Sequence, residues 1–159
     1  MDSAHTSKWA IGEVVLGGPF LIGVAMHFIV PWSLPSGSLQ QAASVIGLAL
    51  SIIGLGLIVS ARREFAAQRQ PTDPGQPTSR IVTTGVFAIS RNPLYLGGVS
   101  VLLGLALMLN ILWTIAMLPV SIVLCHYILI VPEERYLAAK FSDVYRAYQA
   151  SVQRWLGRR

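Results

Sequence analysis

The chain has 159 residues, of which 53% are hydrophobic and only 12% are charged, whereas a typical soluble domain is about 25% charged. The net charge of +5 is compatible with a nucleic-acid partner, but every basic residue lies outside the apolar stretches, which favours anionic lipid headgroups instead. The single cysteine, Cys125, excludes an intrachain disulfide and a cysteine-based metal site. The histidines have no metal-like spacing, so we expect no metal site; they are His5, His27 and His126.

Two long segments, residues 14–61 and residues 92–132, contain no Asp, Glu, Lys or Arg. Each is long enough for two helices that cross the roughly 30 Å hydrocarbon core of a bilayer. A buried soluble core is the alternative, but soluble helices keep a charged outer face. The pattern therefore predicts an all-α membrane protein with one domain over residues 1–159. Four transmembrane helices would form two hairpins, and a C-terminal amphipathic helix would follow them.

The first hairpin is predicted over residues 9–32 and 39–61, with Pro31 and Pro35 ending its first helix. The second hairpin is predicted over residues 93–109 and 111–131, with Asn110 as the turn. Residues 93–109 are near the lower limit of length for a span. Small residues on the second helix allow close packing in lipid without identifying a partner; they are Gly47, Gly54 and Gly56.

The polar parts of the chain indicate its orientation. Residues 62–92 are too polar to cross a membrane and are expected to form a loop at its surface. Residues 133–156 have the aromatic and basic pattern of an amphipathic helix. Of the twelve basic residues, one lies in the N-terminal tail, five lie in 62–91 and six lie in 135–159, while neither hairpin turn has any. This bias predicts that both termini and the central loop are cytoplasmic.

Two polar clusters flank the second hairpin and should meet at one membrane face. The first runs from Arg91 through Asn92, Pro93 and Leu94 to Tyr95, and the second contains Glu133 and Glu134. Arg91 can make a forked hydrogen bond to a carboxylate. Backbone amides at the start of a helix that begins with proline can bind an anionic group. The alternatives are that Arg91 anchors the chain to lipid phosphate and that the two glutamates cap a helix.

This order of motifs, over roughly residues 75–156, resembles the isoprenylcysteine carboxyl methyltransferase and phospholipid methyltransferase family of integral membrane enzymes, especially its short prokaryotic-type members. The resemblance implies methyl transfer from S-adenosylmethionine, with S-adenosylhomocysteine as product. The acceptor would be lipophilic, either an isoprenylcysteine-like carboxylate or a lipid headgroup, at the cytoplasmic face of a bacterial or archaeal cell membrane. The alternative is a small membrane protein that binds lipid or a partner and performs no chemistry.

The resemblance also implies where the cofactor binds. The segment before Gly85 would pass beside the cofactor, and the ring of Phe87 would be placed to contact the sulfonium. No residue is assigned to catalysis. The expected cofactor-binding residues are Arg80, Ile81, Val82, Gly85, Phe87, Arg91, Asn92, Pro93, Leu94, Tyr95, Glu133 and Glu134.

The chain departs from the family pattern at two positions. Asn92 stands where the family commonly has histidine, and an asparagine cannot act as a base near neutral pH. The apolar run 128–131 stands where the eukaryotic carboxyl methyltransferases have an arginine that meets the substrate. His126 is the nearest titratable residue that could replace these groups, and packing within the bundle is its alternative role.

Overall fold

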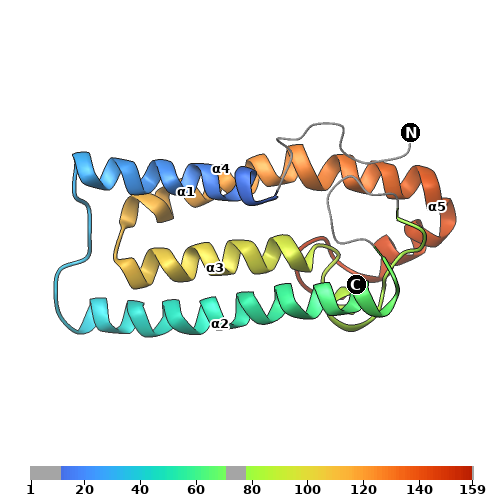
Figure 1. Ribbon diagram of the computed structural model, residues 1–159, viewed down its shortest axis with the longest axis horizontal. Helices are drawn as coiled ribbons and strands as arrows, with labels where there is room; N and C mark the ends of the chain where they lie inside the picture. The colour runs from blue at the N-terminus through green and yellow to red at the C-terminus, as the bar shows by residue number, and fades with distance from the viewer. Residues whose placement is uncertain (1–11, 71–77, 159) are drawn as a thin grey trace.

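The computed structural model describes residues 12–70 and 78–158, and these are almost entirely helical (Figure 1). Within those two ranges there is no strand beyond one isolated pairing of Val152 with Arg158, so the prediction of an all-α fold is confirmed. The elements are α1 (Gly12–Ile29), α2 (Ser38–Ala67), the 3-10 turn η1 (Gly85–Ala88), α3 (Pro93–Leu109), α4 (Leu112–Leu124), the π-helical segment η2 (Cys125–Ile130) and α5 (Val131–Ser151).

The long helices lie side by side in two layers (Figure 1). α2 packs along α3, α1 packs along α4, and α3 also contacts α4. The α1–α2 connection and the α3–α4 turn lie at one end of the bundle, which we call the turn end. The last residues of α2, the start of α3 and α5 lie at the other end, which we call the site end.

Three helices are long and apolar enough to cross a membrane: Gly12–Ile29, Ser38–Ala67 and Leu112–Ser151. α3 is also apolar but has only 17 residues. Large apolar side chains on α1 and α2 face outward, as expected where lipid replaces water. The protein is therefore an integral membrane protein. The side chains that are more than half exposed include Leu21, Ile22, Phe28, Val45, Ile52 and Ile53.

Glycines allow α2 and α3 to approach closely. A Cβ atom added at Gly47 would lie 2.5 Å from the carbonyl oxygen of Gly104, and one added at Gly54 would lie 2.6 Å from that of Gly97. Larger side chains would separate the helices and lose the dispersion contacts that drive association in lipid. The sequence predicted Gly47 and Gly54 as packing residues, and the structure identifies α3 as their partner. A Cβ atom added at Gly56 would meet no neighbouring atom within 4 Å.

Asn110 closes the turn end, as predicted. It has φ 57° and follows α3 in the left-handed conformation, which asparagine adopts more readily than most residues. Its side-chain Nδ2 donates to the carbonyl of Leu34 at 3.0 Å, and its Oδ1 accepts from the Leu34 amide at 2.9 Å. Trp113 adds a hydrogen bond from Nε1 to the carbonyl of Val30 at 2.8 Å. These bonds join the two hairpin turns.

The ends of α1 and α2 differ from the predicted ones. α1 ends at Ile29 instead of residue 32, because Pro31 disfavours a helical residue before it; predicted residues 9–11 lie outside the described ranges. α2 continues to Ala67 instead of 61, because the polar residues after 61 include good helix formers. The surface loop therefore begins at residue 68, and its residues 71–77 also lie outside the described ranges.

The helix predicted over residues 133–156 is present as α5 (Val131–Ser151), but it ends earlier and does not begin as a separate helix after Pro132. Helical residues run without a gap from Leu112 through η2 and into α5 as far as Phe141. Pro132 does not stop the helix, because η2 widens it just before the proline, where the Val131 amide bonds to the carbonyl of His126 five residues earlier. The helix is broken instead at Ser142, which has φ 43° and ψ −114°. The residues after this break fold back toward the bundle (Figure 1).

Candidate functional site

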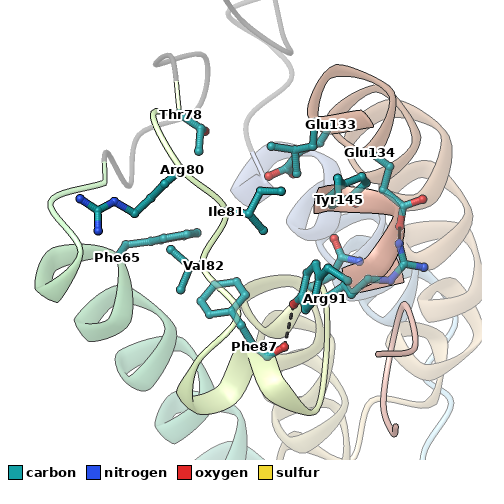
Figure 2. A pocket seen from close by; sticks show the side chains of 13 residues that line it. Phe65, Thr78, Arg80, Ile81, Val82, Phe87, Arg91, Glu133, Glu134 and Tyr145 are labelled. Atoms are coloured by element: carbon teal, nitrogen blue, oxygen red, sulfur yellow. Dashed lines mark hydrogen bonds and ion pairs between the residues drawn. The ribbon is translucent and has the colours of Figure 1, made fainter. Parts of the chain in front are cut away.

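A cavity lies at the site end, between the last turn of α2, the segment after residue 78 and α5 (Figure 2). It encloses about 510 Å³ of space when its open mouth is included, so a ligand held there would stay accessible from one side. Phe65 and Arg80 lie on one side, and Arg91, Glu133 and Glu134 lie on the other. The lining residues are Phe65, Thr78, Arg80, Ile81, Val82, Phe87, Arg91, Asn92, Glu133, Glu134, Leu137, Tyr145 and Tyr148.

Polar side chains at the end of α2 and just after it hold the segment that forms one cavity wall. The buried Gln70 accepts hydrogen bonds at Oε1 from the amides of Ser79 at 2.9 Å and Arg80 at 3.3 Å. The hydroxyl of Thr84 donates to Glu64 Oε2 at 2.6 Å. The extension of α2 beyond the predicted boundary therefore fixes the backbone beside the cavity.

Gly85 turns the chain from this wall into η1. Its φ of 57° is unfavourable for a side chain, and a Cβ atom there would collide with the Glu64 carboxylate. The turn places the buried ring of Phe87 4.9 Å from the ring of Phe65. Together with Ile81 and Val82, these rings give the cavity an apolar side.

The break at Ser142 brings two tyrosines to the cavity. Tyr145 and Tyr148 are both buried, and the Tyr148 hydroxyl donates to the carbonyl of Phe87 at 2.6 Å (Figure 2). An uninterrupted helix would have continued past the bundle, so the fold-back is what joins the end of α5 to η1.

Glu134 is held between two guanidinium groups. Arg154 donates from Nε to Oε1 at 3.0 Å and from Nη2 to Oε2 at 2.6 Å. Nη1 of Arg91 lies 2.9 Å from Oε1 of the same carboxylate. The hydrogen bonds to Glu134 raise the pKa of Arg154. Both carboxylate oxygens are therefore occupied by the protein itself, because forked pairing of this kind is the strongest geometry for guanidinium and carboxylate.

Arg91 is less completely satisfied. Its side chain is 7% exposed, yet among the residues that the structure describes neither Nε nor Nη1 has a hydrogen-bond partner. The contact of Nη1 with Glu134 is close in distance but lacks the direction of a hydrogen bond. Buried donors without partners are rare and costly. A cavity-lining guanidinium with free donors therefore suits an anionic ligand group.

Glu133 provides a second, differently placed carboxylate. Its Oε2 accepts a hydrogen bond from the Tyr95 hydroxyl at 3.3 Å, while the residue also lines the cavity. Glu133 has no ion pair among the described residues. The cavity thus presents one buried guanidinium with donors that make no hydrogen bond to the described residues, and one carboxylate without a cationic partner.

The cavity gathers most of the residues that were expected to bind a cofactor. Because the helix is continuous from Leu112, Glu133 and Glu134 lie within it instead of at the start of a separate helix. Pro93, Leu94 and Tyr95 start α3 behind the cavity wall, with Tyr95 contacting Glu133. Gly85 and His126 also lie outside the lining. The expected residues that line the cavity are Arg80, Ile81, Val82, Phe87, Arg91, Asn92, Glu133 and Glu134.

Several lining residues were not among those expected. Leu137, Tyr145 and Tyr148 carry a sequence signal, because their spacing continues an aromatic and apolar pattern after Glu134. Phe65 carries a weaker signal, because it lies among the helix formers that extend α2 beyond residue 61. Arg154 carries no local signal, since only the break at Ser142 brings it back to Glu134.

Comparison with known proteins gives one match. The model of the phospholipid methyltransferase family matches residues 42–144, about two thirds of the chain. The matched range begins within α2 and ends within α5, so it contains Arg91, Glu133 and Glu134, but not Tyr145, Tyr148 or Arg154. No curated protein and no solved structure matches the chain.

Proposed function

The chain belongs to the phospholipid methyltransferase family, and from that membership we propose that the cavity at its site end is the binding site for the methyl donor. The family consists of membrane methyltransferases that use S-adenosylmethionine, and this chain is an S-adenosylmethionine-dependent methyltransferase. The donor supplies an electrophilic methyl group when it is bound.

The observation that carries the proposal is the pairing of opposite charges in one cavity. Arg91 has buried donors without partners, and Glu133 has a carboxylate without a cationic partner. The methionine part of the donor carries a carboxylate and an ammonium group, which these two side chains complement. Phe65, Phe87 and the apolar wall suit an adenine ring, since ligand pockets combine apolar walls with a few polar groups.

We propose a lipid headgroup as the acceptor, because the family is one of phospholipid methyltransferases. The protein would contribute mainly orientation and the exclusion of water. An amine acceptor must lose a proton before it reacts. Asn92 cannot take that proton, and its Nδ2 is occupied by the carbonyl of Arg154 at 3.0 Å. This observation keeps an isoprenylcysteine-like carboxylate, which needs no base, as the second candidate.

The proposed site requires a particular topology. We propose that α3 is a fourth, short span, that both termini and the site end are cytoplasmic, and that the membrane is a bacterial or archaeal cell membrane. The distribution of basic residues supports this orientation. Labelling of Ser36→Cys at the turn end with a membrane-impermeant thiol reagent should occur only from outside the cell. Labelling from the cytoplasmic side alone would reverse the proposed orientation.

The proposal is tested by calorimetry of the detergent-solubilised protein with S-adenosylhomocysteine. Saturable binding that is lost in Arg91→Ala would support the site, and binding unaffected by that change would contradict it. The acceptor is tested by transfer of labelled methyl groups to phosphatidylethanolamine vesicles or to a prenylated cysteine analogue. Labelling of the prenylated analogue alone would identify the second candidate as the acceptor.

A further inference from the structure

We propose that Arg154 is a positioning residue: by occupying the Glu134 carboxylate, it leaves the Arg91 guanidinium available to the anionic group of the ligand. The inference rests on the proposed function of the cavity and extends it to a residue beyond the range that the family model matches. Arg154 does not line the cavity. Its effect on a ligand must therefore pass through Glu134 and Arg91.

The segment that carries Arg154 is fixed against the site end. Residues 152–158 follow α5 and form a short turn closed by the pairing of Val152 with Arg158. Three hydrogen bonds join this turn to the segment before α3, so Arg154 and Arg91 are held on the same small unit of structure. These run from the Gly157 amide to the Ile89 carbonyl at 2.7 Å, from the Arg91 amide to the Gln153 carbonyl at 3.1 Å, and from Asn92 Nδ2 to the Arg154 carbonyl at 3.0 Å.

The charges explain why a second arginine is needed. Arg91, Arg154 and Glu134 together carry two positive charges and one negative charge. Glu134 gives its forked pair to Arg154, at 3.0 and 2.6 Å, and only a poorly directed contact to Arg91. Without Arg154, the Glu134 carboxylate would be free to form the forked pair with Arg91 instead. The cluster would become neutral, and the Arg91 donors would turn away from the ligand.

The test compares two ligands that differ in the amino-acid part. S-adenosylhomocysteine carries the amino-acid carboxylate and ammonium, and methylthioadenosine has the same nucleoside without either group. Arg154→Gln keeps a polar side chain of similar reach and removes the charge. We expect its affinity for S-adenosylhomocysteine, measured by calorimetry, to fall about tenfold, as for loss of a charged hydrogen bond. The affinity for methylthioadenosine should change less than about threefold. Arg154→Lys should lie between the parent and Arg154→Gln, because lysine keeps charge but not the fork.

The matched control is Arg146→Gln. Arg146 also pairs with a carboxylate on α5, Asp143 at 3.8 Å, but its side chain is 77% exposed, so neither affinity should change. The effect of Arg154→Gln should shrink in a Glu134→Gln background, because there is then no carboxylate to capture Arg91. If Arg154→Gln alone is too unstable to purify, Arg154→Lys takes its place in the comparison of the two ligands.

The outcomes separate this inference from the proposed function. If the parent protein binds neither ligand, the proposed site is wrong and the inference falls with it. If the parent binds S-adenosylhomocysteine and Arg154→Gln binds it equally well, only the inference is overturned. Equal weakening for both ligands would also overturn it, since Arg154 would then support the fold of the cavity instead of its anionic subsite.

Discussion

The turn end and the site end of the bundle both carry polar groups, but they use them differently. At the turn end, the Asn110 side chain donates to the carbonyl of Leu34 and accepts from its amide, and the Trp113 indole donates to the carbonyl of Val30. At the site end, Arg91 keeps buried donors without partners among the described residues, and Glu133 keeps a carboxylate without a cation.

The difference teaches how to recognise the functional end of a small membrane protein. A polar group near a bilayer is ordinarily satisfied by the protein, because an unsatisfied one is costly. The turn end follows this rule and has a structural role. The site end departs from it beside a cavity, which is what a ligand-binding role requires. Substitutions at each end should therefore have separable effects, on affinity at the site end and on stability at the turn end.

The largest effect is expected for Arg91→Ala. The change removes the buried donors that have no hydrogen-bond partner among the described residues, so affinity for S-adenosylhomocysteine should fall about a hundredfold, near 2.7 kcal/mol. Thermal unfolding should change little, because Glu134 keeps its forked pair with Arg154. Arg91→Lys should recover part of the affinity, since it restores charge without the fork. Calorimetry and a thermal melt in the same detergent measure both quantities. A large loss of stability with unchanged affinity would make Arg91 a structural residue like Asn110.

The converse pattern is expected for Asn110→Ala. The substitution removes both hydrogen bonds to Leu34 and should destabilise the protein by about 2 kcal/mol, while cofactor affinity stays the same. Asn110→Gly removes the same bonds but tolerates the positive φ, so it should be less damaging than Asn110→Ala by about 1 kcal/mol. Chemical denaturation followed by calorimetry tests the pair. A weakened affinity in either variant would show that the two ends are coupled.

Much of the fold could be predicted from the sequence, because charge-free length is a strong signal in membranes. Residues 93–109 were placed correctly, and so was the turn at Asn110. The junction between η2 and α5 could not be predicted, because Pro132 normally marks a helix boundary and only the π-helical geometry of η2 accommodates it. The break at Ser142 was also unforeseeable, since serine at that position gives no warning of a positive φ.

The site was predictable where it depends on local motifs. Arg91, Glu133 and Glu134 were expected to meet, and they line one cavity. The sequence could not show that the two glutamates have different surroundings, because that depends on Arg154 reaching back to Glu134. Two neighbouring glutamates thus differ: one carboxylate is paired with arginine, and the other has no cationic partner among the described residues, because of a contact between residues twenty positions apart in the chain.

Glu133→Gln tests that separation. The substitution keeps the shape and the contact with the Tyr95 hydroxyl but removes the negative charge, so affinity for S-adenosylhomocysteine should fall about tenfold, near 1.4 kcal/mol. Methylthioadenosine lacks the ammonium group as well as the carboxylate, and its affinity should not change. Calorimetry with both ligands makes the measurement. Tyr95→Phe is the control, because it removes the neighbouring hydroxyl while the carboxylate keeps its charge. A larger loss in Tyr95→Phe than in Glu133→Gln would contradict the proposed role of Glu133.

The smallest effects are expected for two aromatic side chains that donate hydrogen bonds, one at each end of the bundle. The Tyr148 hydroxyl donates to the carbonyl of Phe87 at 2.6 Å, and Trp113 Nε1 donates to the carbonyl of Val30 at 2.8 Å. Tyr148→Phe leaves a buried carbonyl unsatisfied and should cost about 1 kcal/mol of stability. Trp113→Phe removes a similar bond and should be destabilising as well.

The two substitutions should differ in binding. Tyr148 and Phe87 both line the cavity. The loss of their hydrogen bond should therefore loosen η1 against α5 and lower the affinity for S-adenosylhomocysteine about threefold, less than 1 kcal/mol. Trp113 lies at the turn end, next to Trp32 at a ring separation of 5.1 Å, and its variant should bind as the parent does. Melting curves and calorimetry on both proteins give the comparison. If Trp113→Phe weakened binding as much as Tyr148→Phe, general loosening of the bundle would account for both losses. The contacts at the site end would then have no specific effect on binding.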